Sequence, residues 1–260
     1  MEFRSPTDIV KEYLQAVQDY SLLSAQSIAN IFRRPRYLNE TLMQADVMGV
    51  GSLPVVIMTG FSIGASLALQ SSNTLQRFGS LSLTGQLVSL SMVRELGPLL
   101  TGMMVAGRNS SGMASELGSM KVTEQIDAMR ALGTDPSKKL VTPRVISSIF
   151  MLFILTIIGD LVGLCGGWTI ARLVLGLDSN QYWSTAWQSL QFADVFMGLF
   201  KPLLFGFIIS TIGCYFGMFA KGGTQGVGRA TTQAVVVADV LIVVVDFFVS
   251  KFLMAIMHVH

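Results

Sequence analysis

Five long runs of apolar residues dominate the chain and are separated by shorter, more polar joins. A helix needs about 20 mostly apolar residues to cross a bilayer, so each run predicts one membrane-spanning helix. The second run contains Arg94, Glu95 and Arg108 and is the least uniform, and the third is long enough for a tilted helix. We therefore expect an all-α membrane protein with five transmembrane helices, at roughly 47–70, 88–115, 145–175, 194–219 and 232–257.

A different pattern fills residues 1–36, ahead of the five-span domain expected over 37–260. Apolar residues recur there at helical spacing, and early charges leave no uninterrupted apolar core of the kind a signal peptide needs. We expect an amphipathic helix lying in the membrane interface, with an ordinary helix packed on a neighbour as the alternative. The apolar positions are Ile9, Val10, Tyr13, Leu14, Val17, Ile28, Ile31 and Phe32, and a basic cluster of Arg33, Arg34 and Arg36 follows.

The basic residues in the joins predict the orientation, because Lys and Arg are retained on the cytoplasmic side. The joins near 71–87 and 176–193 hold only Arg77, with Arg172 at the border, and Trp183 and Trp187 there fit an interfacial aromatic belt. We expect a cytoplasmic N-terminus and an outward C-terminus. The basic residues on the expected cytoplasmic side are Arg4, Lys11, Arg33, Arg34, Arg36, Lys121, Arg130, Lys138, Lys139, Arg144, Lys221 and Arg229.

Composition supports the membrane assignment and narrows the function classes. Hydrophobic residues make up 51% of the chain and charged ones 13%, against about 25% charged in ordinary soluble domains. The net charge of +2 is too small for a nucleic-acid binder. Cys165 and Cys214 both lie in apolar runs, so we expect membrane-embedded thiols and no disulfide.

Signals for catalysis are weak. The two histidines, His258 and His260, lie at the extreme C-terminus, where a His-x-His tail with no metal role is the simpler interpretation. The stretch 223–228 imitates a phosphate loop, but Arg229-Ala230 follow where Lys and Ser or Thr would be needed. We expect no catalytic residue, metal site or cofactor in this chain. Uphill transport would then draw its energy from an ion gradient or from a partner.

Charged residues inside the spans are costly and usually face a bundle interior or a cavity. At about 1.5 Å of rise per residue, Glu95, Lys201 and Asp246 fall in the outer half of the bilayer. Together with Arg94 they predict one electroneutral cluster, and separate snorkelling of each group to the interface is the alternative. The other intramembrane charges are Asp160, Asp239 and Lys251.

Residues 121–136 predict a short helix between the second and third spans. Thr123 has the residue type of an N-cap, with Glu124 in the first turn, and the turn residues Gly133 and Pro136 end the segment. An apolar stripe follows three-residue spacing at Ile126, Met129 and Leu132. Such a helix either packs on the membrane face or docks into a cytoplasmic protein and transmits its motion.

Stripes of small residues run along several expected helices. Such stripes let two helix backbones approach closely. They allow packing within one subunit or an interface between subunits, and the sequence leaves both open. The stripes are Gly60 and Gly64, then Gly159, Gly163 and Gly167, then Gly213 and Gly217.

Several motifs resemble the MlaE/YrbE permease family over roughly residues 40–257. The most specific block is 91–144. The motifs are Ser91-Met-Val-Arg94-Glu95-Leu-Gly97-Pro98, Ala106-Gly107-Arg108, Glu116-Leu-Gly118, Thr123-Glu124-Gln125-Ile126-Asp127-Ala128-Met129, Asp135-Pro136, Thr142-Pro143-Arg144, Gly228-Arg229-Ala230-Thr231-Thr232 and Val245-Asp246-Phe247.

The resemblance implies the membrane subunit of an ABC-type transporter in the bacterial inner membrane. It implies a homodimer with two cytoplasmic ATPase subunits, which hold ATP and magnesium, and a periplasmic ring of MCE-domain proteins, and it allows a small cytoplasmic auxiliary subunit. The implied cargo is phospholipid, moved between inner and outer membranes to maintain outer-membrane asymmetry. The rivals are an ion-coupled secondary transporter using Glu95, Asp160 and Asp246, and a scaffold that only anchors the ring.

The resemblance also assigns roles to particular residues. The family's intramembrane charges near the lipid cavity match Arg94, Glu95, Lys201 and Asp246. Its ATPase coupling helix matches Thr123, Glu124, Gln125, Ile126, Asp127, Met129, Leu132 and Gly133.

Overall fold

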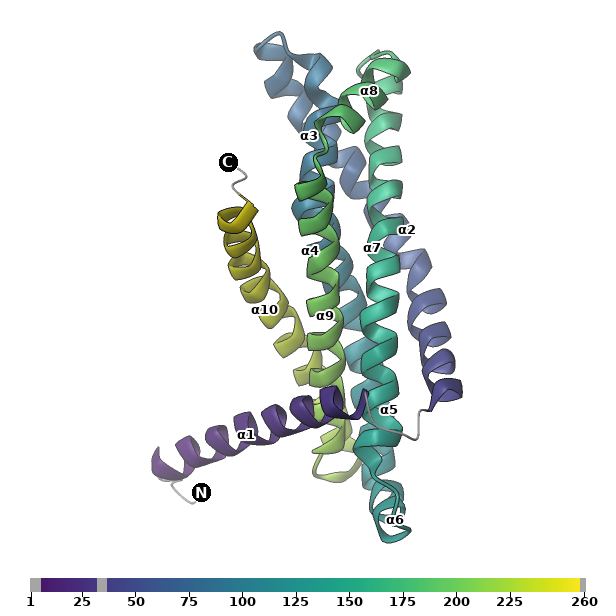
Figure 1. Ribbon diagram of the computed structural model, residues 1–260, viewed down its shortest axis with the longest axis vertical. Helices are drawn as coiled ribbons and strands as arrows, with labels where there is room; N and C mark the ends of the chain where they lie inside the picture. Colours follow the sequence, from purple (N-terminus) through teal and green to yellow (C-terminus); the bar gives the residue numbers. More distant parts are fainter. Residues whose placement is uncertain (1–5, 32–36, 258–260) are drawn as a thin grey trace.

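The computed structural model describes residues 6–31 and 37–257, and this part of the chain is all-α (Figure 1). The basic cluster expected at Arg33, Arg34 and Arg36, and the terminal His258 and His260, lie outside the described residues. The α-helices are α1 (Pro6–Ile31), α2 (Leu38–Arg77), α3 (Thr84–Ser91), α4 (Gly97–Val105), α5 (Ser111–Val122), α6 (Gln125–Ala131), α7 (Thr142–Leu173), α8 (Ser179–Ser189), α9 (Phe192–Met218) and α10 (Gly223–Met257).

Four helical segments in the described residues are long and apolar enough to cross a membrane. They are Leu38–Arg77, Ser137–Leu173, Phe192–Met218 and Gly223–Met257. The expected second span is built differently, as α3, α4 and α5 joined by two π-helical stretches, η2 (Met92–Leu96) and η3 (Ala106–Ser110). These stretches contain the charged residues that interrupt the second apolar run.

The long helices run side by side, with α7 and α9 in the middle (Figure 1). The short helix α6 protrudes at one end of the bundle and α8 covers the other, and we call these the α6 end and the α8 end. Helix α10 leans away from the other long helices along its length. Helix α8 occupies a join for which the sequence predicted no helix; it begins where Asp178 accepts a hydrogen bond from the Asn180 N–H at 3.1 Å.

Helix α1 lies across the bundle near the α6 end (Figure 1). Its Leu23 and Ser27 are buried, and the Tyr20 hydroxyl lies 3.0 Å from Thr211 Oγ1 on α9. Leu14 and Val17, by contrast, are each 63% exposed. The helix therefore packs on the bundle with one face, as the alternative predicted, and presents apolar side chains outward with another. Its place in the membrane interface stays a prediction.

The glycine stripes pack helices within the subunit. Gly60 and Gly64 on α2 meet Gly159 and Gly163 on α7, so closely that a Cβ at Gly64 would overlap the Gly163 carbonyl oxygen. Gly213 on α9 packs in the same way on the backbone of Ser110, at the end of η3. Small residues are needed because nothing larger fits between these backbones. Of the two interpretations that the sequence left open, the structure therefore supports packing within one subunit.

Replacing Gly64 by alanine is expected to destabilise the α2–α7 contact by about 1–3 kcal/mol, since the added methyl group forces the backbones apart. Gly228→Ala is the matched control, because nothing lies within 4 Å of a Cβ at that helical glycine. Alanine should be neutral or stabilising there. Reversible unfolding in mixed micelles measures both, and equal stabilities would contradict the close-packing argument.

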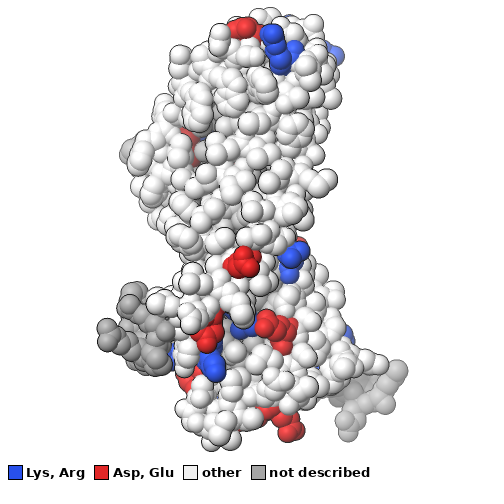
Figure 2. Space-filling model, turned by 90° about the vertical axis from the view of Figure 1, so that its right-hand side faces the viewer, with Lys and Arg blue, Asp and Glu red and all other residues white. Residues whose placement is uncertain are grey.

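Charge is distributed as a membrane protein requires. Figure 2 shows, on one face, a broad stretch of surface with a single acidic side chain at its left edge, between a few charged side chains at the α8 end and a larger group toward the α6 end. Ionised groups avoid the hydrocarbon region, so this band of few charges is the part of the bundle that we expect in the bilayer.

Candidate functional site: a buried lysine and a protruding helix

Lys201 on α9 is the centre of a buried charge cluster, which we call the Lys201 cluster (Glu95, Lys201 and Asp246). Lys201 is 0% exposed, and its Nζ donates to Glu95 Oε2 at 2.6 Å. The same Nζ lies 3.0 Å from Asp246 Oδ1 on α10, an ion pair whose angles do not make a hydrogen bond. The cluster joins α9, η2 and α10, three elements far apart in sequence. The pairing favours a cluster over separate snorkelling.

The π-helical stretch η2 makes room for this lysine. Pro98 has no N–H, so the carbonyl of Arg94 loses its α-helical partner four residues on. Lys201 Nζ donates to that carbonyl at 2.9 Å. Ser250 on α10 adds a hydroxyl that donates to Glu95 Oε2 at 3.3 Å. The lysine thus binds a backbone oxygen that the proline leaves free as well as the two carboxylates.

The expected role of Arg94 needs correction. Its side chain does not join the Lys201 cluster but pairs with Asp194, to which Nε donates at 2.6 Å. Asp194 also accepts from the Gln191 N–H at 2.9 Å and forms a capping box at the start of α9. The Arg94–Asp194 pair is neutral by itself, whereas the Lys201 cluster holds two acids and one base, so the cluster is not electroneutral when all its groups are ionised. Sequence reasoning missed Asp194, because Gln-x-x-Asp departs from the usual Ser/Thr-x-x-Glu/Gln capping-box pattern.

Asp160 on α7 lies apart from this cluster. It is 7% exposed, its Oδ1 has no hydrogen-bond partner, and it faces Gly97 at the start of α4. A Cβ at Gly97 would overlap that oxygen. The three acids Glu95, Asp160 and Asp246, considered together as proton sites from the sequence, are thus divided between two locations.

The protruding helix α6 is anchored at one residue and exposed at another. Ile126 is fully buried in an apolar cluster with residues of α5, α7 and α9, and Met129 packs against it. Leu132, the third residue of the expected stripe, is instead 83% exposed just after α6 ends. The other buried members of this cluster are Leu23, Met48, Met113, Leu117, Val141, Val145, Cys214 and Met218.

The start of α6 also differs from expectation. Thr123 does not cap it but ends α5, where its hydroxyl donates to the Ser119 carbonyl at 2.9 Å. Glu124 takes the N-cap position in a left-handed conformation, with φ 60°, which turns the chain sharply between α5 and α6. Gln125 Nε2 donates to the Thr123 hydroxyl at 3.1 Å. Gly133, with φ 76°, ends the segment as predicted.

Three charged side chains link α6 to the end of α5. Lys121 Nζ donates to Asp127 Oδ2 at 2.7 Å, and Arg130 Nη1 to Oδ1 at 3.3 Å. The hydrogen bond from Lys121 is the main cause that lowers the pKa of Asp127 below its ordinary value. The carboxylate is consequently satisfied within the chain, and the exposed Glu124 and Leu132 are left to meet another surface.

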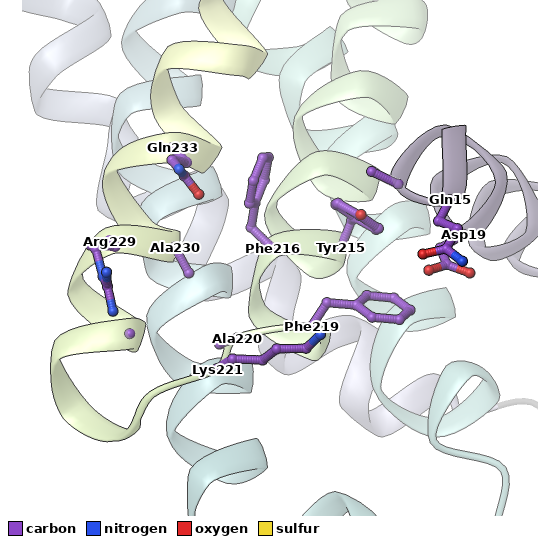
Figure 3. Close-up of a pocket in the computed structure, with 12 residues that line it drawn as sticks. Gln15, Asp19, Tyr215, Phe216, Phe219, Ala220, Lys221, Arg229, Ala230 and Gln233 are labelled. Carbon is purple, nitrogen blue, oxygen red and sulfur yellow. The ribbon is translucent and has the colours of Figure 1, made fainter. Parts of the chain in front are cut away.

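Two sizeable cavities lie toward the α6 end, away from the Lys201 cluster. One, of about 600 Å³, opens between α1, α9 and α10, where Phe216 lies between the two long helices and Asp19 reaches in from α1 (Figure 3). The other, of about 380 Å³, separates α2 from η3 and α5 and is lined by Arg108 and Glu116. In the described residues, no group of three His, Cys, Asp or Glu side chains is placed to hold a metal ion.

Comparison with known proteins places this architecture in a family. The family model described as Permease MlaE matches residues 41–252. A probable ABC transporter permease protein of Rickettsia typhi is 43% identical over 93% of this chain and 93% of its own length. The intermembrane phospholipid transport system permease protein MlaE of Haemophilus influenzae is 32% identical over 80% of each chain.

A plant protein extends the comparison. The chloroplastic protein TRIGALACTOSYLDIACYLGLYCEROL 1 of Arabidopsis thaliana is 36% identical over 89% of this chain and 66% of its own length. The match over nearly all of the bundle, including η2 and α6, shows that this chain belongs to the MlaE permease family.

Proposed function

We propose that this chain is the permease subunit of an ABC transporter that moves phospholipids between the inner and outer membranes of a bacterial cell and so maintains outer-membrane lipid asymmetry. The observation that carries the proposal is the family match over residues 41–252. The names of the Haemophilus and Rickettsia relatives support the cargo and the transporter class.

In the proposed topology the chain crosses the inner membrane five times, with α3–η2–α4–η3–α5 as the second span. The α6 end faces the cytoplasm and the α8 end the periplasm, so the N-terminus is cytoplasmic and the C-terminus periplasmic. The excess of Lys and Arg in the joins of the α6 end supports this orientation.

The proposed assembly has two copies of this chain, two cytoplasmic ATPase subunits and a periplasmic ring of MCE-domain proteins, with room for a small cytoplasmic auxiliary subunit. The ATPase subunits hold ATP and magnesium. This chain acts as the lipid pathway and performs no catalysis.

Coupling in this proposal runs through α6. A helix held by Ile126 in the apolar cluster cannot move without moving the helices that line it. Closure of the ATPase subunits against Leu132 and Glu124 would therefore tilt α5, α7 and α9 together. The first, second and fifth spans line the lipid cavity, which opens or collapses as these helices tilt.

The Lys201 cluster would act at the lipid pathway. Because Glu95 keeps a 36% exposed side chain while Lys201 is enclosed, a headgroup can reach the carboxylate from the side of α10. The cluster either orients the headgroup or holds α9, η2 and α10 in one of two arrangements, since breaking an ion pair can bias such an equilibrium.

Reconstitution tests the function directly. Proteoliposomes carrying the chain with its ATPase and MCE partners should transfer fluorescent phospholipid only with ATP and magnesium. Omitting the ATPase subunits is the control. Transfer that persists without them and follows a proton gradient would favour the ion-coupled alternative instead, and a ring that assembles without any lipid transfer would favour the scaffold.

A further inference from the structure

Arg108 and Asp239 are charges of opposite sign inside the proposed spans, and neither has an ion-pair partner among the described residues; Asp160 and Lys251 also lack one. Arg108 in η3 is exposed on the outside of the bundle and lines the cavity of about 380 Å³. Asp239 on α10 is half-buried, and its Oδ1 is enclosed without a hydrogen-bond partner. Charged groups within a membrane nearly always pair or face water, and both residues keep exposed surface that a group from outside this chain can reach.

The other intramembrane charges cannot serve as those partners. Arg94 pairs with Asp194, and Lys201 with Glu95 and Asp246. Asp160 is enclosed against Gly97 and is 7% exposed. Lys251 lies twelve residues beyond Asp239 on α10, or about 18 Å along the helix.

Arg108 and Asp239 lie at nearly the same depth in the bundle. A Cβ at Gly102 would be 3.7 Å from Ile242, and one at Gly118 would be 3.2 Å from Val227. Residue 102 is therefore at about the depth of residue 242, and residue 118 at about the depth of residue 227. Linear interpolation between these two pairs places Arg108 at about the depth of residue 236 on α10. Asp239 is then about 4 Å further toward the α8 end. Both side chains lean toward the N-terminus of their helix, so Arg108 leans toward the α8 end, Asp239 leans back, and the gap closes.

We propose that Arg108 pairs with Asp239 of a second copy of this chain, so that two identical ion pairs close the dimer within the membrane. This inference rests on the two-copy assembly proposed above. Two copies inserted in the same direction are related by a two-fold axis parallel to the long helices, which keeps each residue at its own depth. Only groups at equal depth can then pair across the axis, and these two satisfy that condition.

The arrangement of the helices fits the same axis. Helices α2 and α10 lie on opposite sides of the bundle (Figure 1). The Arg108 guanidinium lies against Gly51 on α2. A two-fold axis that lies beside the face between α2 and α10 carries the partner's α10 to this α2 side, toward the guanidinium. Because the contact is isologous, it forms twice. Beside Asp239, α10 presents the exposed apolar residues Val236, Val240 and Val243, which a partner helix could cover.

Heterotypic cross-linking between two tagged chains tests the pair. Both chains carry Cys165→Ser and Cys214→Ala, and one carries Arg108→Cys while the other carries Asp239→Cys. A short bismaleimide in native membranes should then join the two tags. Asp46→Cys in place of Asp239→Cys is the matched control, because this exposed acid on α2 would lie away from the partner's Arg108, and it should give no product.

Charge exchange supplies the energetic test, with native mass spectrometry of the purified full complex as the readout. Arg108→Glu or Asp239→Lys alone should reduce the dimer fraction about tenfold at limiting concentration, and Arg108→Asp combined with Asp239→Arg should restore it. The pairing is wrong if the chain is dimeric but the cross-link does not form. It is also wrong if the single charge reversals leave the dimer fraction unchanged.

Two further outcomes separate this inference from the proposed function. Native mass spectrometry also detects phospholipid that stays bound to the complex. If Arg108→Gln removes a bound phospholipid and the charge-exchange variant does not regain it, Arg108 binds a lipid phosphate and the ion pair is wrong. If a dimer that does not form the cross-link still transfers lipid with ATP, the ion pair is wrong but the proposed function stands. A chain that is monomeric in the active complex would remove the two-copy assembly itself.

Discussion

Replacing Lys201 by methionine is expected to destabilise the protein by about 3–5 kcal/mol, because it leaves two carboxylates without their shared cation. Lys201 is enclosed, and it also binds the Arg94 carbonyl that Pro98 leaves free. Methionine fills a similar volume, so the loss measures charge and hydrogen bonding more than packing. Unfolding in mixed micelles measures the stability, and ATP-dependent lipid transfer measures the function.

A combined variant shows whether the loss arises from the unpaired acids. Lys201→Met together with Glu95→Gln and Asp246→Asn should recover most of the stability, since no buried charge is left uncompensated. Lys251→Met is the matched control, because that lysine is exposed on α10 and its removal should change the stability little. If Lys201→Met alone is as stable as the parent chain, the cluster has no structural role.

Leu132→Asp is expected to weaken binding of the ATPase subunits at least about tenfold while leaving the fold intact, since a charge at the centre of an apolar contact is strongly unfavourable. Leu132 is 83% exposed and contributes little to packing within the chain. Ile126→Asp should behave differently, because it puts a carboxylate into the apolar cluster and detaches α6 from the bundle. Co-purification of the ATPase and lipid-stimulated ATP hydrolysis distinguish the two effects.

Leu173→Asp controls for the added charge, because Leu173 is 78% exposed at the opposite end of the bundle. It should leave ATPase binding unchanged. Full ATPase recovery and full turnover with Leu132→Asp would show that α6 does not carry the coupling contact, whatever the topology of the bundle.

Residue pattern alone was enough for much of the fold. Apolar runs longer than a bilayer is thick can be satisfied only as helices, so the long helices α2, α7, α9 and α10 follow from composition and spacing. The short helix α6 follows from its polar flanks and from the turn residue Gly133. The pattern could not show that Leu132 leaves the stripe, because exposure depends on where α5, α7 and α9 lie around Ile126.

The candidate site was only partly accessible to the same reasoning. Depth along each helix brought Glu95, Lys201 and Asp246 to one level, but depth contains no information about rotation around a helix axis. That rotation directs Arg94 away from the cluster and toward Asp194. The π-helical stretch η2, which contains Arg94 and ends just before Pro98, contributes to it, because an extra residue in one turn rotates the side chains around the helix axis.

The sequence by itself determined that this protein is a bundle of membrane helices with the short helix α6 between two spans and a few charged residues inside the spans. The reason is that the hydrophobic effect and the need to satisfy backbone hydrogen bonds act on any such chain. Only the tertiary structure decided which charges meet, that the glycine stripes join α2 to α7 within one subunit, and that Arg108 and Asp239 are left without partners. These depend on how helices rotate and pack against one another, and side-chain contacts between distant segments set that geometry.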